Sequence, residues 1–399
     1  MVLREVPAHC GRMILLTLVV AAVASPIPST EELLARSKKM VSSSSCIGHG
    51  ACDTCVAVPE GAAASACFWC LQDDRCHPAG QEASCKGGSQ HSITNSTRCP
   101  TAPEPASNFD LATAERMAVY SYAAYYDDPR SYGQFPSTAE VMKTFFYKMG
   151  HWNHAFGFVA MDRHRQEVIL AFRGSDTLWQ LMEEIIHSSL VDWPKVPGAK
   201  VNEFFNMAHM DLHENITQTF KVIQNLCLEV GGCRFFITGH SLGGAMAGLA
   251  AMRLADEFEA VQRSLQVYTF GQPRVGNAII AHRINLLVPN YFRVVNALDV
   301  VPHIPGCTQN SSDANDTDAC DKEADAYYHA GSEYWFPEGD YQYGVMCHFR
   351  TCLPMKEDMS CSDGALLDAW PRESDHHHYW DVIPNGYCQN PAQASQIVV

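Results

Sequence analysis

The segment around Ser241 has the composition of a turn that presents a nucleophile. Ser241 lies between Gly239 and Gly243, with apolar residues at 235–238 before it and small residues at 245–251 after it. These flanks predict a strand that runs into the turn and a helix that leaves it. Such a turn strains the serine backbone and leaves no space for flanking side chains, which explains the two glycines. We expect a nucleophile above a helix N-terminus, which favours negative charge on the substrate. A phosphate-binding glycine loop or a plain turn is the alternative.

A nucleophilic serine needs a base, and the base needs an acidic partner that fixes its tautomer. Asp299 follows the apolar stretch 291–296, a predicted strand, and strand ends are where open α/β sheets carry their chemistry. We therefore expect Asp299 to be the acid. The histidines beyond it are candidates for the base: His303, His329, His348 and the run His376, His377 and His378.

Two of these histidines are poor candidates for the base. His303 is too close in sequence to Asp299 to reach Ser241 from a separate loop, and His329 lies in an aromatic segment, 327–335, that is typical of a strand. The three adjacent histidines project in three directions, which disfavours metal binding by them. Residue types alone leave the choice within the run 376–378 open.

Elements that alternate between strand and helix must position these residues. Apolar stretches predict strands at 156–161, 168–172, 235–238, 265–270 and 291–296, and helical patterns cover 222–228 and 245–258. A further helix, with Asn108 as its N-cap, is expected to begin near residue 109. This alternation predicts an α/β fold with a mostly parallel central sheet.

Composition and charge exclude several classes of protein. The chain has 399 residues, of which 47% are apolar and 18% charged, so it is neither disordered nor collagen-like. The formal net charge of −16 excludes a nucleic-acid binder, because phosphate backbones need a basic face. The charge also argues against long-range attraction to anionic membranes. A core of this size needs no metal or cofactor to hold it.

The N-terminus and the cysteines indicate an exported protein. Arg4 and Arg12 precede an apolar run, 13–24, which ends in Ala-Val-Ala and predicts a signal peptide over 1–24. Twelve residues are too few to span a bilayer, although an N-terminal anchor is the alternative, and no later stretch is apolar enough. We expect a secreted protein, or a lumenal one, without a transmembrane anchor after cleavage. Four glycosylation sequons fit this compartment: Asn95, Asn215, Asn310 and Asn315.

Cysteines divide the chain into parts. Eight of them crowd into residues 46–99, a segment too short for a core of its own, and in an oxidising compartment they predict disulfides rather than zinc. A proline-rich linker follows at 100–107, and the rest of the chain, 108–399, is expected to be one catalytic domain. Cys227 and Cys233 are close enough for a local bridge.

Two resemblances follow from these motifs. Residues 108–388 resemble the class 3, fungal-type triacylglycerol lipases, a branch of the α/β-hydrolase fold. The likeness rests on five blocks in order: Ala171-Phe-Arg-Gly-Ser175, Thr238-Gly-His-Ser-Leu-Gly-Gly-Ala245, Tyr268-Thr-Phe-Gly-Gln-Pro-Arg-Val-Gly-Asn277, Asn296-Ala-Leu-Asp299-Val-Val-Pro-His-Ile-Pro305 and His329-Ala-Gly-Ser-Glu-Tyr-Trp335. The Cys67-Phe-Trp-Cys70 segment looks like the plexin–semaphorin–integrin cysteine-rich module, which implies a spacer without activity, its protein partner unknown.

The lipase resemblance implies a role for each residue of the site. The family's catalytic histidine precedes an aromatic residue by three positions, which matches His376 and Tyr379 and makes His329 structural; His377 and His378 stay as alternatives. Ser241 would be the nucleophile and Asp299 the residue that orients the base. The backbone N–H groups of Leu242 and Ser175, with the Ser175 hydroxyl, would form the oxyanion hole. No metal or cofactor is implied.

The segment after Ser175 corresponds to the family's lid. Its apolar residues recur at helical spacing, which predicts an amphipathic helix. The candidate lid residues are Leu178, Trp179, Leu181, Met182 and Ile185. Two interpretations are open: a flap that opens where its apolar side meets lipid, and a helix that faces the core.

The leading hypothesis is a secreted serine carboxylic-ester hydrolase that acts on triacylglycerols, at a lipid–water interface or on dissolved ester, through an acyl-enzyme. A phospholipase or a feruloyl or acetyl esterase of the same fold is the alternative within this chemistry. A non-catalytic binding glycoprotein is the alternative from another class, because the cysteine-rich module is typical of receptor ectodomains.

Overall fold

The structure is a computed structural model, and it describes residues 55, 67–70, 75–78, 92–93, 109–149, 153–175, 178–194, 196–307, 320, 322, 325–337, 349–368 and 372–379. The predicted signal peptide, the linker 100–107 and three of the sequons, Asn95, Asn310 and Asn315, lie outside these residues.

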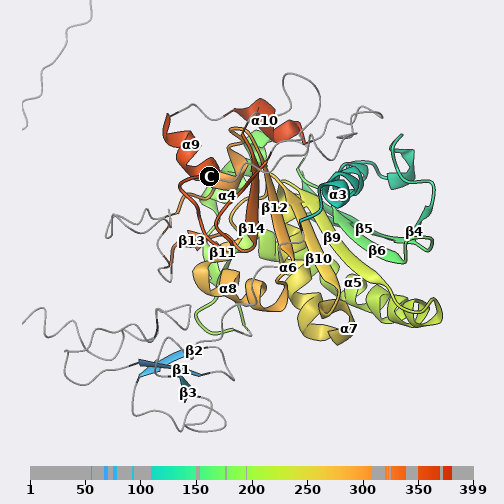
Figure 1. Ribbon diagram of the computed structural model, residues 1–399, viewed down its shortest axis with the longest axis horizontal. Helices are drawn as coiled ribbons and strands as arrows, with labels where there is room; N and C mark the ends of the chain where they lie inside the picture. Colours follow the sequence, from blue (N-terminus) through green and yellow to red (C-terminus); the bar gives the residue numbers. More distant parts are fainter. Residues whose placement is uncertain are drawn as a thin grey trace, which may run out of the picture. The chain divides into compact units, whose positions relative to one another are not determined.

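An eight-stranded sheet forms the centre of the fold (Figure 1). Its order is β15 (Arg350–Thr351), β14 (Ser332–Phe336), β12 (Tyr291–Asn296), β10 (Leu265–Phe270), β9 (Arg234–His240), β6 (Glu167–Phe172), β5 (Asn153–Asp162) and β4 (Ala139–Met149). The pairs from β14 to β6 are parallel, and the outer strands β15, β5 and β4 pair antiparallel. The expected mostly parallel sheet is confirmed.

Helices cover both faces of the sheet. Successive side chains of a strand point to opposite sides, so the apolar residues of each strand are divided between the two faces. In β9, Phe235 and Ile237 belong to one apolar cluster and Phe236 to the other. The first cluster packs against α5 (Glu203–Glu229), α6 (Leu242–Glu257) and α8 (Ala278–Leu287), and the second against α3 (Leu111–Ala123). Both faces are therefore buried, as a parallel sheet requires.

Shorter elements complete this part of the chain. A second sheet has the order β13 (Tyr327–Tyr328), β11 (Gly276–Asn277), β8 (Lys200–Asn202) and β7 (Leu190–Asp192). The remaining helices are η4 (Pro129–Ser131), α4 (Leu178–His187), α7 (Glu259–Gln262), η5 (Val301–His303), α9 (Ser362–Asp368) and α10 (Glu373–His377).

Two local expectations need correction. The N-cap of α3 is Asp110 rather than Asn108, because the Asp110 carboxylate accepts hydrogen bonds from the Thr113 N–H and hydroxyl at 2.9 and 2.5 Å. The helical pattern at 222–228 is confirmed and belongs to a longer helix that begins at Glu203. The segment 327–335 is two strands rather than one, with His329 between them.

The cysteine-rich part contains a small antiparallel sheet with the order β2 (Arg75–Pro78), β1 (Cys67–Cys70) and β3 (Ser92–Ile93). Phe68 is buried and stacks on His77, with ring centroids 5.3 Å apart. Cys55 and Cys76 form a disulfide, and Cys67 and Cys70 are disulfide-bonded as well. Elsewhere the expected local bridge between Cys227 and Cys233 is present.

Candidate active site

The turn between β9 and α6 places Ser241 in an unusual backbone conformation. Ser241 has φ 59° and ψ −129°, a region that L-residues other than glycine rarely occupy. A Cβ at Gly239 would come within 2.2 Å of the Gly243 carbonyl, and one at Gly243 within 2.3 Å of the Phe172 carbonyl oxygen. The two glycines therefore allow the turn to close against the end of β6.

This close approach brings the segment that ends at Ser175 to the nucleophile turn. The Cβ that Gly243 lacks would also lie 3.0 Å from the Arg173 carbonyl carbon, two residues before Ser175. Leu242 is the first residue of α6, so its N–H has no acceptor within the helix. The Leu242 N–H is thus a backbone donor beside Ser241, and the helix dipole adds positive potential there.

Asp299 and His376 form a buried pair. Asp299 lies three residues beyond β12 and His376 lies in α10, and both side chains are fully buried. The His376 Nδ1–H donates to the two carboxylate oxygens of Asp299 at 3.0 and 2.9 Å. With the proton on Nδ1, the Nε2 atom of His376 carries a lone pair and is able to accept a proton.

The other partners of Asp299 keep its carboxylate ionised. The Tyr379 hydroxyl donates to Oδ2 at 2.5 Å, and the Val301 N–H donates to Oδ1 at 2.8 Å. Burial by itself raises the pKa of Asp299, but His376 and these hydrogen bonds outweigh burial and leave the pKa below its usual value. Burial and the Asp299 charge raise the pKa of Tyr379, which therefore stays a donor.

Ser241, His376 and Asp299 gather around one turn at the end of β10. The Phe270 carbonyl accepts the Ser241 N–H at 2.9 Å. At the next residue, Gly271, φ is +56° and a Cβ would lie 2.6 Å from Asp299 Oδ2 and 2.8 Å from His376 Nδ1. The structure thus brings together the three residues that the sequence predicts for the site.

His240 links the nucleophile turn to the backbone of His376. Because a carbonyl only accepts, His240 Nε2–H donates to the His376 carbonyl oxygen at 2.7 Å, and the Tyr125 hydroxyl then donates to His240 Nδ1 at 2.8 Å. Burial and the neighbouring His376 lower the pKa of His240 to about 3, so it stays neutral. Nothing in the local sequence around His240 or Tyr125 predicts these contacts.

The other candidate histidines have different surroundings. His377 is exposed, and His378 Nδ1–H donates to the Ser374 carbonyl. His329 is buried and donates from Nε2 to the Pro302 carbonyl at 2.7 Å, a structural contact. His303 donates from Nδ1 to Asp363 at 2.7 Å. Of these histidines and His376, His376 is the one that contacts Asp299.

The predicted lid segment forms helix α4. Ile185 is fully buried in the core, and Met182 packs partly against the same core, as the core-facing interpretation expects. The side chains of Leu178, Trp179 and Leu181 lie outside the described residues. For these three residues the lid stays a prediction.

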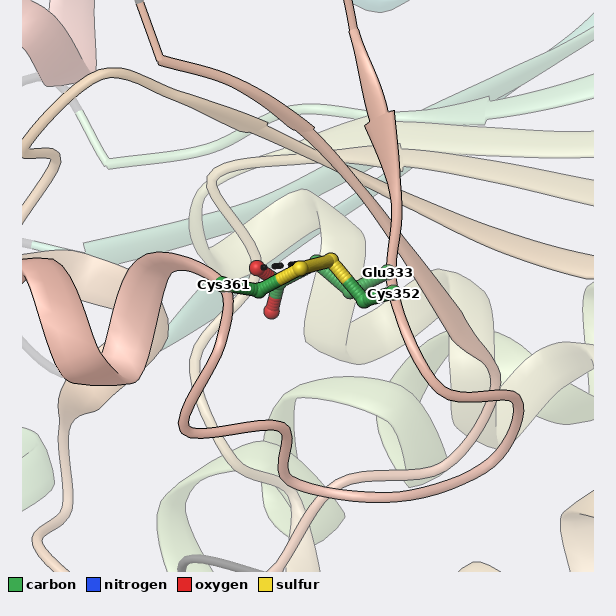
Figure 2. Close-up of side chains that lie close together, drawn as sticks. All are labelled: Glu333, Cys352 and Cys361. Carbon is green, nitrogen blue, oxygen red and sulfur yellow. Dashed lines mark hydrogen bonds between the residues drawn. A yellow bond between two sulfur atoms is a disulfide. The ribbon is translucent and has the colours of Figure 1, made fainter. Parts of the chain in front are cut away.

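One group of potential metal ligands comes together in the described part of the chain, namely Glu333, Cys352 and Cys361 (Figure 2). The two cysteines form a disulfide, so neither offers a thiolate. Glu333 is occupied by Ser362, whose N–H and hydroxyl donate at 3.2 and 2.6 Å. The group is therefore a structural feature, and nothing in it suits a resident ion.

Two sequence expectations concern the surface. Asn215 is exposed on α5, while the hydroxyl of Thr217 in its sequon donates to Glu257 at 3.0 Å. None of the helices among the described residues combines the length and the apolar character needed to cross a bilayer.

The chain is similar in sequence to known lipases. The profile of the family described as lipase (class 3) matches residues 169–309. Lipase ZK262.3 of Caenorhabditis elegans is 30% identical over 301 residues, which is 70% of this chain and 81% of the worm protein. A lipase of Rhizopus niveus is 26% identical over 227 residues, and there the match spans 57% of this chain and 51% of the relative, about half of its length.

Solved structures of lipases have a fold similar to that of this chain. Lipase II from Rhizopus niveus superimposes with a TM-score of 0.55 at 23% identity, covering 69% of this chain and 96% of that one. A triacylglycerol lipase whose catalytic centre is described as a serine-protease triad gives a TM-score of 0.54 at 24% identity, covering 68% and 96%. At these identities the likeness shows the α/β-hydrolase fold alone.

Proposed function

The chain belongs to the class 3 lipase family and is an ester hydrolase, and from this premise we propose that it hydrolyses triacylglycerols outside the cell. Ser241 is the nucleophile, His376 the general base and Asp299 the residue that orients His376. One observation carries the proposal: a buried Asp299–His376 pair, bonded at 2.9 Å, shares a turn with a strained serine.

Acylation begins with attack on the ester. The Ser241 hydroxyl oxygen forms a bond to the ester carbonyl carbon while its proton moves to His376 Nε2. The carbonyl oxygen becomes an oxyanion, held by the N–H groups of Leu242 and Ser175 and by the Ser175 hydroxyl. Each such donor contributes about 3 kcal/mol to the stability of the transition state. The bond to the alcohol then breaks, and His376 gives its proton to the departing glyceride oxygen.

Deacylation repeats these steps with water. His376 Nε2 takes a proton from water, whose oxygen attacks the acyl carbon. The bond to Ser241 then breaks, His376 returns the proton to the Ser241 oxygen, and the fatty acid leaves. Asp299 is ionised throughout, because its pKa is held below the usual value, and it stabilises the His376 cation in each half-reaction. The cycle consumes one water and needs no cofactor.

The remaining parts of the chain suit an exported enzyme. The predicted signal peptide over 1–24, sequons and disulfides such as Cys55–Cys76 support secretion. The cysteine-rich segment 46–99 is a module of the plexin–semaphorin–integrin type that acts as a spacer. The His376–Asp299 pair beside Ser241 supports an enzyme over a non-catalytic binding glycoprotein.

The substrate class is tested with the purified full-length chain. We expect carboxylic acid to be released faster from emulsified tributyrin and triolein than from phosphatidylcholine, methyl ferulate or an acetylated polysaccharide, because relatives of this chain are named triacylglycerol lipases. The release is measured by pH-stat titration. Faster turnover of the phospholipid or ferulate would overturn the substrate class and leave ester hydrolysis standing, whereas no release from any ester would overturn the proposal.

A further inference from the structure

Arg274 is a buried arginine in the block 268–277, for which the sequence suggests no chemical role. Its Nε and Nη2 donate to the two carboxylate oxygens of Glu357 at 2.9 and 3.3 Å, and Nη2 also donates to Asp363 Oδ1 at 3.1 Å. Nη1 donates to the carbonyl oxygens of His303 and Pro305 at 2.8 and 3.1 Å. These five bonds use as many donors as a guanidinium has.

The two carbonyls belong to the segment 299–305, which begins with Asp299 and which we call the acid loop. The backbone N–H of Arg274 donates to a third carbonyl, that of Ile304, at 2.9 Å. Arg274 therefore holds the last three carbonyls of the acid loop, at residues 303–305. Because residues 303–305 are fixed in this way, the position of Asp299 at the other end of the acid loop is restricted.

Further contacts hold the middle of the acid loop. His329 Nε2–H donates to the Pro302 carbonyl, and its backbone N–H donates to Glu357 at 2.8 Å. His303 donates to Asp363, the second carboxylate on Arg274. The loop and the two carboxylates thus form one connected network.

The middle of the loop also sets the orientation of the Asp299 carboxylate. η5 spans residues 301–303, and the N–H of Val301 at its start donates to Asp299 Oδ1 at 2.8 Å. A shift of η5 would move this donor, and the carboxylate with it, away from His376. The network and the Asp299–His376 pair are therefore mechanically connected through three residues of backbone.

Charge balance makes this network stiff. Burial lowers the pKa of Arg274, but Glu357 and Asp363 raise it further, so the guanidinium keeps its charge. Burial likewise raises the pKa of Asp363, but the His303 hydrogen bond and Arg274 lower it more, and the carboxylate stays ionised. Removal of one partner from a buried ion network leaves an uncompensated charge, which disrupts the surrounding structure.

Glu357 is held in place by a closed loop. The Cys352–Cys361 disulfide joins the ends of this loop (Figure 2). Inside it, the Asp358 carboxylate accepts the N–H groups of Leu353 and Ser360 at 2.7 and 2.8 Å. Glu357 thus reaches Arg274 from a segment that is itself fixed.

We propose that Arg274, Glu357 and Asp363 are positioning residues for the reaction: they brace the acid loop and so hold Asp299 against His376. This inference rests on the proposed roles of Asp299 and His376. It assigns a physical task to Arg274, a residue of the block 268–277.

The test compares Glu357→Gln with Glu167→Gln in the full-length chain. Glu167 is a matched control because it is equally buried and also pairs with arginines, accepting from Arg116 and Arg234 at 3.2 and 2.7 Å. It begins β6, about 17 Å of strand away from the end that meets the nucleophile turn. Both variants lose a buried carboxylate and are expected to lose stability; only Glu357→Gln loosens the acid loop.

For Glu357→Gln we expect kcat on p-nitrophenyl butyrate to fall about 100-fold with KM nearly unchanged, because a displacement near 1 Å has this cost. Kinetics are measured below the melting temperature of each variant, as recorded by circular dichroism. The low-field proton resonance of the His376 Nδ1–H, which reports its bond to Asp299, should shift or broaden in Glu357→Gln and stay in Glu167→Gln.

Each outcome decides the inference. Equal kcat losses in the two variants, or an unchanged low-field resonance in Glu357→Gln, would overturn it while the wild type still hydrolyses the ester. An inactive wild type would instead overturn the proposed function. If Glu357→Gln cannot be purified folded, Asp363→Asn replaces it, because the bidentate Arg274–Glu357 pair stays in that variant. A loss of kcat with unchanged KM in Asp363→Asn supports the positioning role, and an unchanged kcat overturns it.

Discussion

Replacing Ser241 by alanine is expected to lower kcat on p-nitrophenyl butyrate by about 10⁶-fold, the loss seen when a triad nucleophile is removed. The reason is that the Ser241 oxygen forms the covalent bond to the acyl group. Slow hydrolysis above the rate in water should persist, because the oxyanion donors of Leu242 and Ser175 remain. Initial rates at several substrate concentrations measure the effect.

Ser264→Ala is the matched control for this substitution. Ser264 is half-buried and donates to the Cys233 carbonyl at 3.2 Å, away from the nucleophile turn. Its kcat should equal that of the wild type. The melting temperatures of both variants should lie near the wild-type value, since alanine meets the same backbone strain at position 241 as serine does. A Ser241→Ala protein that keeps wild-type kcat would disprove the role of Ser241.

Asp299→Asn should reduce kcat about 10⁴-fold with little change in KM. An asparagine amide is able to donate to His376 Nδ1, which moves the imidazole proton to Nε2 and removes the lone pair that accepts the Ser241 proton. Tyr379 and Val301 donate to different oxygens of Asp299, so the single asparagine oxygen keeps one of these two donors and some loss of stability is expected. The rate constant is measured with the same ester.

Asp162→Asn provides the control for this change. Asp162 is also buried and accepts from the Thr138 hydroxyl at 2.6 Å and from Arg165 Nη1 at 2.9 Å, at the β5 side of the sheet. It should lose stability and keep kcat. If Asp299→Asn and Asp162→Asn lowered kcat equally, the effect would be one of stability, and Asp299 would have no part in orienting the base.

The nucleophile turn could be predicted from the sequence because its constraints are local. Gly239 makes room for Gly243 only four residues further on, and the flanking apolar and small residues share the same window, whereas the contact of Gly243 with Phe172 is long-range. The strands at 265–270 and 291–296 are likewise predictable to the residue, since nearly all of their positions are buried and aromatic or β-branched residues predominate in both.

The sequence patterns do not predict β4 or the first half of α5, and each has a physical reason. β4 carries a register shift between Val141 and Lys143, which breaks the period-two alternation that marks a strand. α5 buries polar His209 on its inner face and exposes apolar Met207 on its outer face, which blurs the helical period of its first half.

Long-range contacts of the site have no signature in a single sequence. His240 reaches the carbonyl of His376 across 136 residues, and Arg274 reaches Glu357 across 83. Nothing in the neighbourhood of either residue specifies its partner. The choice of His376 over His377 depends in the same way on which histidine α10 turns toward Asp299.

The most direct measurement of the central claim is the site of covalent labelling by a fluorophosphonate. The folded full-length chain is treated with the probe, digested and analysed by mass spectrometry. We predict one adduct per chain, on the Ser241 hydroxyl, and none when the protein is denatured first, because only the assembled His376–Asp299 pair activates that serine. An active protein without an adduct, or one labelled on a different residue, would contradict the account.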